Sequence, residues 1–433
     1  MKRLPVVLLI LLLVGSLSAR EITLSEAVEL ALAHDARIST ASEGIEAAET
    51  ATLAAWGGYL PRLGVNAGYT RSWSGPSTTE VPGYGEVTNE ERVANGLSLG
   101  ATATLPLFSG GAIFNGIDSA QHAQSLAEQS AVATEAQVRY DARAAYISLY
   151  RSKALLASAE RSLESAEEQL RYSDKLAEVG SLSAVDALKT RAAADSAALG
   201  VIESRYAYLS AMANLAYLCG LPVDEELIPT TELSVKPGAR EPGAVLDQLD
   251  DTPTMRMAED SYAQAQASRR AATSAWWPSL SLQGGYNWSD NTPLEDQWLE
   301  ENYSFSLGVY LSWTLPFMDG FATNARLASA RVEELRTRLS RRDTQRQMEL
   351  QLRLALDSIA SAEEKVVVSR SSYERAVDDL DLAQRRLELG SGTLLAALEA
   401  EANLSASETA LTDAEASFAL ACFNLDLLLA AEE

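Results

Sequence analysis

Cysteine and long apolar runs are both scarce in this sequence. It holds two cysteines among 433 residues, Cys219 and Cys422, each within an apolar stretch that has a helical pattern. Two thiols cannot build the framework of several disulfides that holds small secreted domains together, and in such surroundings cysteine serves as a small hydrophobic residue. Beyond residue 19, no segment has the roughly 20 consecutive apolar residues that a membrane-spanning helix requires. The sequence therefore excludes a disulfide-rich domain and a helical membrane protein.

Basic residues and histidines are also few. The chain carries 35 Lys and Arg against 60 Asp and Glu, a formal net charge of −25, which excludes nucleic acid as a partner because phosphate contact needs a basic patch. The two histidines, His34 and His122, stand apart in helical segments and are interpreted as surface or packing residues. No phosphate loop, nucleophile elbow or metal-ligand spacing is present. No catalytic, cofactor-binding or metal site is predicted, and the protein is not expected to be an enzyme.

The N-terminus has the pattern of a secretory signal peptide. Lys2 and Arg3 precede an apolar run at 4–14, and small residues follow at 15–19. A basic start, a short apolar stretch and a small-residue cleavage site are typical of such a peptide, and the run is too short to span a bilayer. Residues 1–19 are therefore predicted to be a signal peptide, with an uncleaved N-terminal anchor as the alternative.

The second half of the chain repeats the first. Thr104-Leu105-Pro106 recurs as Thr314-Leu315-Pro316, and Gly180 recurs as Gly390, both at an offset of 210 residues. The spacing from proline to glycine is 74 residues in both copies, which indicates an element that tolerates no insertions. We expect a first strand-and-helix repeat at 20–228, a proline-rich linker at 229–242 and a second repeat at 243–433.

Four segments alternate between apolar and small polar residues, the pattern of β-strands. They lie near 61–73, 96–107, 278–289 and 303–316, and the loops at Ser72–Gly96 and Asp290–Asn302 are expected to be long and turn-rich. The polar faces are almost uncharged, which suits the lumen of a membrane barrel better than the surface of a soluble sheet. Aromatic residues near the strand ends fit interfacial belts: Trp73, Trp276, Trp277 and Trp288.

Four strands cannot close a membrane barrel, because open edges are not tolerated in hydrocarbon. The chain must therefore oligomerise, with two copies giving eight strands and three giving twelve. A four-stranded sheet on a soluble domain is the alternative.

Between the strand pairs, the apolar period changes to 3.5 residues, which predicts close-packed coiled-coil helices. The seam runs through the second copy at Met348, Leu352, Ala355, Ile359, Ala362, Val366, Ser369, Tyr373, Ala376, Leu380, Ala383 and Leu387. The equivalent positions 210 residues earlier continue the same register from Val138 to Ala177. From Gly110 to Gly180 such a helix extends about 105 Å at 1.5 Å per residue. Helical hairpin tips are predicted near 180 and 390, followed by shorter returning helices at Val185–Leu218 and Leu394–Leu429.

Over nearly its whole length after residue 19, the chain resembles the TolC family of outer-membrane efflux proteins. The resemblance rests on the opening segment at 24–32, on the Leu-Pro pairs at 60–61, 105–106 and 315–316, and on the paired tips Ala177–Leu188 and Leu387–Leu398. It implies an α+β membrane protein: a trimeric 12-stranded outer-membrane β-barrel, with four strands per chain, continued by a long periplasmic α-helical coiled-coil barrel. It further implies a channel subunit of a tripartite efflux or type I secretion system, with a periplasmic adaptor protein, an inner-membrane RND, ABC or MFS transporter and outer-membrane lipid as partners.

The resemblance also implies roles for the tips and the entrance. Adaptor contacts are expected at Val179, Gly180, Ser181, Leu182, Leu389, Gly390 and Ser391. The family's Val-Gly-Leu-type tip motif is matched only in part, because Ser181 replaces the leucine. Of the acids that ring the entrance in some members, Asp186 is kept, its second-copy equivalent is Ala396, and the following ring position is Glu399. A solvated glutamate on a helix face is the alternative for Glu399.

Two other functions fit parts of the pattern. A structural periplasmic coiled-coil scaffold without a pore would be soluble without detergent. An outer-membrane enzyme would gather polar residues at one place.

Overall fold

The computed structural model describes residues 20–83, 85–179, 183–231, 242–290, 303–315, 318–389 and 391–430. The chain forms two compact units. The helical unit is drawn from Met1–Gly44, Glu128–Met257 and Asp343–Glu433, and the sheet-containing unit from Ile45–Ala127 and Ala258–Arg342.

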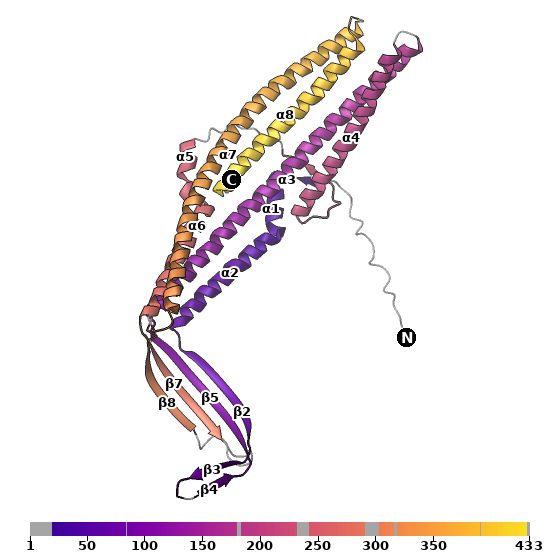
Figure 1. The fold of residues 1–433 in the computed structure, drawn as a ribbon. Coiled ribbons are helices and arrows are strands. Elements are labelled where there is room, and N and C mark those ends of the chain that lie inside the picture. The colour runs from indigo at the N-terminus through magenta and orange to yellow at the C-terminus, as the bar shows by residue number, and fades with distance from the viewer. Residues whose placement is uncertain are drawn as a thin grey trace, which may run out of the picture. The chain divides into compact units, whose positions relative to one another are not determined.

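Four antiparallel strands form the sheet, in the order β2-β5-β7-β8 (Figure 1). They are β2 (Arg62–Ser74), β5 (Arg92–Phe108), β7 (Ser279–Asp290) and β8 (Tyr303–Ser312). Their register aligns the alternating residues in rows across the sheet, such as Val65 with Ala101, Tyr286 and Phe305. The neighbouring row holds Gly64, Thr102, Gly285 and Ser306. One face is therefore apolar and the other small and polar, as the alternation predicted.

The prediction of a long loop at Ser72–Gly96 is largely wrong, because most of this segment forms β-strands. β2 and β5 stay paired out to Ser74 and Arg92, and the segment between them folds as a hairpin of β3 (Ser77–Val81) and β4 (Gly85–Asn89). Gly83, with φ of +94°, lies in the turn between β3 and β4. The turn residues in this segment mark that hairpin rather than an irregular loop. Of the second loop, residues 291–302 lie outside the described part of the chain.

The helices come in matched pairs. α2 (Ala36–Trp56) and α6 (Pro253–Thr273) have 21 residues each, and α3 (Ala112–Glu178) and α7 (Ala322–Glu388) have 67 each. The returning helices α4 (Ala184–Leu218) and α8 (Leu394–Leu429) have 35 and 36 residues. The shorter elements are α1 (Leu24–His34), α5 (Pro242–Asp247) and the 3-10 turns η1 (Gly57–Tyr59), η2 (Leu249–Asp251) and η3 (Ser274–Trp276).

Glycines with left-handed backbones turn the chain toward each long helix. Gly110, with φ of +63°, and Gly320, with φ of +65°, are 210 residues apart. A Cβ on Gly110 would lie 2.7 Å from the Ser274 carbonyl oxygen, so any larger residue there would displace backbone.

Within the helical unit, α4, α3, α8 and α7 lie side by side in that order (Figure 1). Ion pairs join each neighbouring pair: Arg205 with Glu160 for α4 and α3, Arg151 with Asp413 for α3 and α8, and Arg370 with Glu415 for α8 and α7. The predicted seam is confirmed, because all its positions are buried or half-buried except Ala177. The outer helices of the row are α4 and α7.

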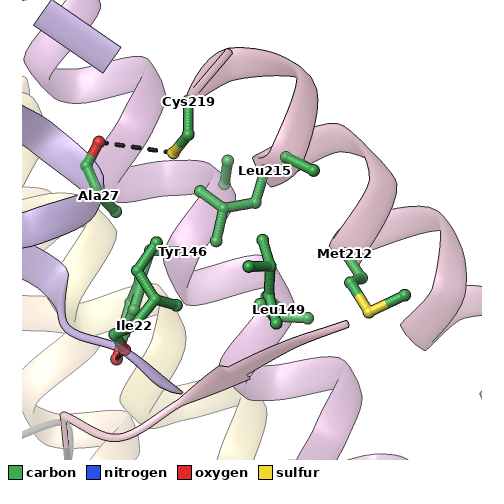
Figure 2. Packing of buried hydrophobic residues seen from close by; sticks show 10 residues of the cluster. Ile22, Ala27, Tyr146, Leu149, Met212, Leu215 and Cys219 are labelled. Atoms are coloured by element: carbon green, nitrogen blue, oxygen red, sulfur yellow. Dashed lines mark hydrogen bonds between the residues drawn. The ribbon is translucent and has the colours of Figure 1, made fainter. Parts of the chain in front are cut away.

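The largest apolar cluster surrounds the start of the described chain. β1 (Arg20–Ile22) pairs in parallel with β6 (Leu227–Pro229), a pairing that the sequence did not predict. Ile22, Tyr146, Leu215 and other residues of β1, α1, α3, α4 and β6 pack together there (Figure 2). Cys219 belongs to this cluster, and its thiol points to the Ala27 carbonyl oxygen, 3.6 Å away (Figure 2). Its expected role as a small buried hydrophobic residue is confirmed.

Candidate functional site

Two helical hairpins end the α3–α4 and α7–α8 pairs. α3 and α7 stop at Glu178 and Glu388, and the returning helices begin after Ser183 and Thr393. The hydroxyls of these two residues accept hydrogen bonds from the amides of Val185 (3.1 Å) and Ala396 (3.2 Å), which satisfies amide groups that a helix start leaves free. The serine and threonine caps therefore fix where each returning helix begins.

Three of the predicted adaptor-contacting residues are described, and they lie at these tips. Val179, Leu389 and Ser391 are exposed, the first two with large apolar side chains. Gly180, Ser181, Leu182 and Gly390 lie outside the described residues. The exposed apolar side chains suit contact with another protein, and their role stays a prediction.

A cavity of about 440 Å³ lies between the two hairpins. It is lined by Tyr172, Leu176, Asp186, Lys189, Thr190, Leu387, Gly392, Thr393, Leu395 and Leu398. The Lys189 ammonium is 3.9 Å from the Asp186 carboxylate, so the charge of that acid is partly balanced within its own helix. The cavity is otherwise mostly apolar.

The two predicted entrance acids have different surroundings. Both acids are exposed, but Asp186 lines the cavity beside Lys189, whereas Glu399 is not among the lining residues. The tips therefore do not bring the two acids together at this cavity within one chain. Any ring of Glu399 side chains needs other copies of the chain.

Buried polar groups near the tips were missed by the sequence reasoning. Burial raises the pKa of the half-buried Glu401 carboxyl, against the opposing effect of a hydrogen bond with Ser165. Ser173 is fully buried, and its hydroxyl has no hydrogen-bond partner within the described residues. Ser173 occupies a seam position, so the heptad pattern indicated its burial but not its missing partner.

The predicted interfacial aromatics are not equivalent. Trp73, Trp276 and Trp277 are exposed, and the Arg71 guanidinium lies 5.3 Å from the centre of the Trp73 ring. Trp288 is only 5% exposed, between its cross-strand neighbours Leu99 and Tyr303. In the single chain, Trp288 therefore packs within the sheet-containing unit instead of presenting a free surface.

The histidines take up packing and surface roles. The His34 ring lies against Gly220, where an added Cβ would be 2.7 Å from the His34 Cβ, and His122 lies 2.9 Å from Asp260. Among the described residues, no group of three or more His, Cys, Asp or Glu side chains is arranged to hold a metal ion. No helix in the described ranges is both long and apolar enough to cross a membrane.

Comparison with known proteins identifies the family. The sequence profile of the family described as outer membrane efflux protein matches residues 27–221 and 246–431. The chain belongs to this family. The protein is therefore an outer-membrane channel of the efflux or secretion type, and the resemblance to TolC-family proteins is confirmed.

Relatives of this outer membrane efflux protein come from several bacteria. Protein CyaE of Bordetella pertussis is 27% identical over 371 residues, which cover 82% of this chain and 72% of CyaE. The probable efflux pump outer membrane protein TtgC of Pseudomonas putida is 24% identical and covers 77% of this chain and 69% of TtgC. The Campylobacter jejuni CmeC outer membrane channel has the same fold, with a TM-score of 0.83 at 18% identity over 94% of this chain and 85% of CmeC. A membrane protein from Pseudomonas aeruginosa, 21% identical, aligns with a TM-score of 0.79 over 94% of this chain and 93% of its own.

Proposed function

We propose that three copies of this channel protein close one twelve-stranded barrel in the outer membrane and a helical tunnel in the periplasm. Substrates delivered by an inner-membrane transporter would leave through this duct. The observation that carries the proposal is the open sheet: in the described structure, β2 and β8 each have a strand partner on one side only. A sheet in hydrocarbon must close, and β8 of one copy can pair with β2 of the next in the same antiparallel pattern.

The exposed apolar surface of the sheet supports this arrangement. Val65 on β2 is 86% exposed and Leu311 on β8 is 70% exposed, and both belong to the apolar face. Such a face is stable against lipid and unstable against water. The small polar residues of the opposite face suit a wet lumen.

The outer helix α4 also has an apolar stripe that no other part of the described structure covers. α4 exposes Leu199, Ile202, Tyr206 and Leu209, which follow one another at steps of three and four residues. Such a stripe lies on one helix face and needs another helix to cover it. In a closed ring, a neighbouring copy covers it.

The tips are the proposed contact with a periplasmic adaptor, which links the channel to an RND, ABC or MFS transporter. Val179 and Leu389 present apolar side chains beyond the ends of the long helices. The names of CyaE and TtgC do not decide between secretion and efflux for this chain. Photo-crosslinking from these two positions in cells should capture the adaptor, and an absence of adducts would contradict the contact.

The experiment that tests the channel uses the full-length protein in detergent and then in planar bilayers. We expect a protein mass of three chains by light scattering and stable conductance after insertion. A monomer without conductance would overturn the proposal.

The same bilayer assay tests the proposed ring of Glu399 side chains, because three acids at a constriction favour cations. Glu399→Ala should reduce the cation preference. Glu374→Ala, at an exposed site on α7, is the matched control. An unchanged preference in Glu399→Ala would exclude the ring.

A further inference from the structure

Within one chain, helix α3 of the first repeat contacts helix α6 of the second repeat, and we call this contact the α3–α6 junction. His122 Nδ1 lies 2.9 Å from Asp260 Oδ1, and the Ser125 hydroxyl donates a 2.6 Å hydrogen bond to the other oxygen of that carboxylate. Arg270 lies 3.4 Å from Asp118 in the same junction. All these residues belong to the sheet-containing unit. The first repeat thus contacts the second through polar and charged side chains.

The duplication defines a second junction of the same kind. α7 is the equivalent of α3 at an offset of 210, and α2 is the equivalent of α6 at an offset of 217. In the described part of the chain, no hydrogen bond or ion pair joins α7 to α2. α2 leads into the edge strand β2, and α7 follows the edge strand β8. A copy that pairs its β8 with another copy's β2 therefore brings its α7 beside that copy's α2.

Several residues at the equivalent positions are apolar, although Asp260 corresponds to another acid, Glu43. His122 corresponds to Val332 and Ser125 to Leu335, both on α7, and Arg270 corresponds to Leu53 on α2. These three side chains are exposed in the single chain, Leu53 by 72% and Val332 by 65%. Exposed leucine and valine at positions that form a junction elsewhere in the same chain indicate a surface that is buried on assembly.

Charges of opposite sign flank these apolar residues. Arg331, Arg338 and Arg342 lie on the Leu335 face of α7, at steps of three and four residues from it, and are exposed. Glu46 and Glu49 lie on the Leu53 face of α2 and are also exposed. Among the described residues, none of these five charges has an ion-pair partner. One side of the chain is thus locally basic and the other locally acidic, although the whole protein is strongly acidic.

We propose that these two faces form a charge-coded interface between copies, in which the α7 arginines of one copy meet the α2 glutamates of the next around an apolar centre of Leu53, Val332 and Leu335. The inference rests on the proposed trimer, and it assigns the residues by which one copy recognises the next. A lipid surface or a single foreign protein cannot match two faces of opposite charge at both sheet edges. A second copy presents both faces at once.

Charge reversal on the full-length protein in detergent tests the interface. Arg331→Glu with Arg338→Glu places two new glutamates on the face proposed to meet Glu46 and Glu49, and Glu46→Lys with Glu49→Lys places two lysines on the face proposed to meet the α7 arginines. Since like charges at an interface oppose association strongly, either pair should lower the trimer-to-monomer ratio at least about tenfold. Arg353→Glu with Arg375→Glu is the matched control, because Arg353 has its own partner in Glu349 and both lie elsewhere on α7. The control should leave the ratio unchanged.

The fourfold variant that carries both reversals decides between lost pairing and lost folding. It restores opposite charges between the four reversed positions and leaves Arg342 unchanged, so it should recover trimers and should not co-purify with differently tagged wild-type chains. Trimers that persist at wild-type levels in both reversed pairs would overturn the charge code while leaving the trimer intact. A fourfold variant that stays monomeric would also overturn it. A wild-type monomer would instead remove the proposed function itself.

Discussion

Removal of one hydroxyl from the core of the helical unit should loosen the β1–β6 pairing. Tyr146 on α3 is fully buried, and its hydroxyl donates to the Ile22 carbonyl oxygen at 3.2 Å and accepts from the Thr231 amide at 2.9 Å. Tyr146→Phe keeps the ring and its packing and deletes only these two hydrogen bonds. The variant therefore isolates what ties the two short strands to the long helix.

The free-energy cost of Tyr146→Phe depends on which of the two backbone groups loses its hydrogen-bond partner. The Ile22 carbonyl still accepts from the Thr230 amide at 3.2 Å and from the Thr230 hydroxyl at 3.3 Å, so it loses little. The Thr231 amide loses the tyrosine oxygen as its acceptor. One such amide in a partly buried site costs about 1–2 kcal/mol, which is roughly a 5- to 30-fold change in the local opening equilibrium.

Hydrogen exchange with mass spectrometry measures that opening directly. Amides in the peptides around 20–30 and 225–231 should exchange about 5- to 30-fold faster in Tyr146→Phe, whereas peptides from the hairpin tips should not change. Tyr217→Phe on the exposed side of α4 serves as the control and should exchange like the wild type. Equal exchange in Tyr146→Phe and the wild type would show that the hydroxyl does not hold the strands.

The Cys219 thiol, the Glu401 carboxyl and the Arg143–Asp426 ion pair give three further predictions. Burial raises the pKa of the Cys219 thiol to about 11 from 9.0, so at pH 8 its thiolate is about 100-fold rarer than in an ordinary thiol; iodoacetamide should label it only after denaturation, and rapid native labelling would contradict its burial. The raised pKa of Glu401 means that folding favours its protonated form, so its stabilising contribution is present below the ordinary value of 4.5 and lost as pH rises. Glu401→Gln should therefore raise the melting temperature at pH 7 and leave it unchanged near pH 4. Arg143→Ala removes the cation 3.5 Å from the largely buried Asp426 carboxylate and should cost about 3–5 kcal/mol in unfolding experiments, whereas Arg143→Met with Asp426→Leu should cost less; equal losses would argue against a desolvation penalty.

The strands and the seam could be predicted because each depends on local periodicity, and the repeat could be predicted because residues recur at a constant offset of 210. The equal lengths of α3 and α7, 67 residues each, follow from the equal spacing between Pro106 and Gly180 and between Pro316 and Gly390. The parallel pairing of β1 with β6 could not be predicted, since three-residue strands carry too little pattern and their partners lie about 200 residues apart.

The side-by-side order of α4, α3, α8 and α7 likewise depends on long-range packing. Heptads show that each helix has a seam but not which helix fills it. The burial of Trp288 depends on its cross-strand neighbours, which alternation alone does not specify.

At the candidate site, the sequence indicated where the hairpin tips lie but not the surroundings of the acidic side chains near them. Asp186 and Glu399 were predicted from the resemblance as members of the same kind of ring, yet Lys189 lies beside only the first. A lysine three residues along the helix is visible in the sequence, and its effect follows once α4 is known to begin at Ala184. The raised pKa of Glu401 depends on burial against the facing helix, which no single-helix pattern reveals.

The different chemistry of the two repeat junctions has a physical reason in the proposed assembly. The α3–α6 junction joins two halves of one chain, so their effective concentration is high and a few polar contacts such as His122–Asp260 are sufficient. The α7–α2 junction must form between separate molecules, which lose translational freedom on association. Apolar residues at Leu53, Val332 and Leu335 supply buried area there, and the flanking arginines and glutamates increase the rate of encounter and disfavour wrong pairings. Duplication provided two copies of one junction. The α7–α2 junction, which forms between molecules, carries the apolar centre and the charge code.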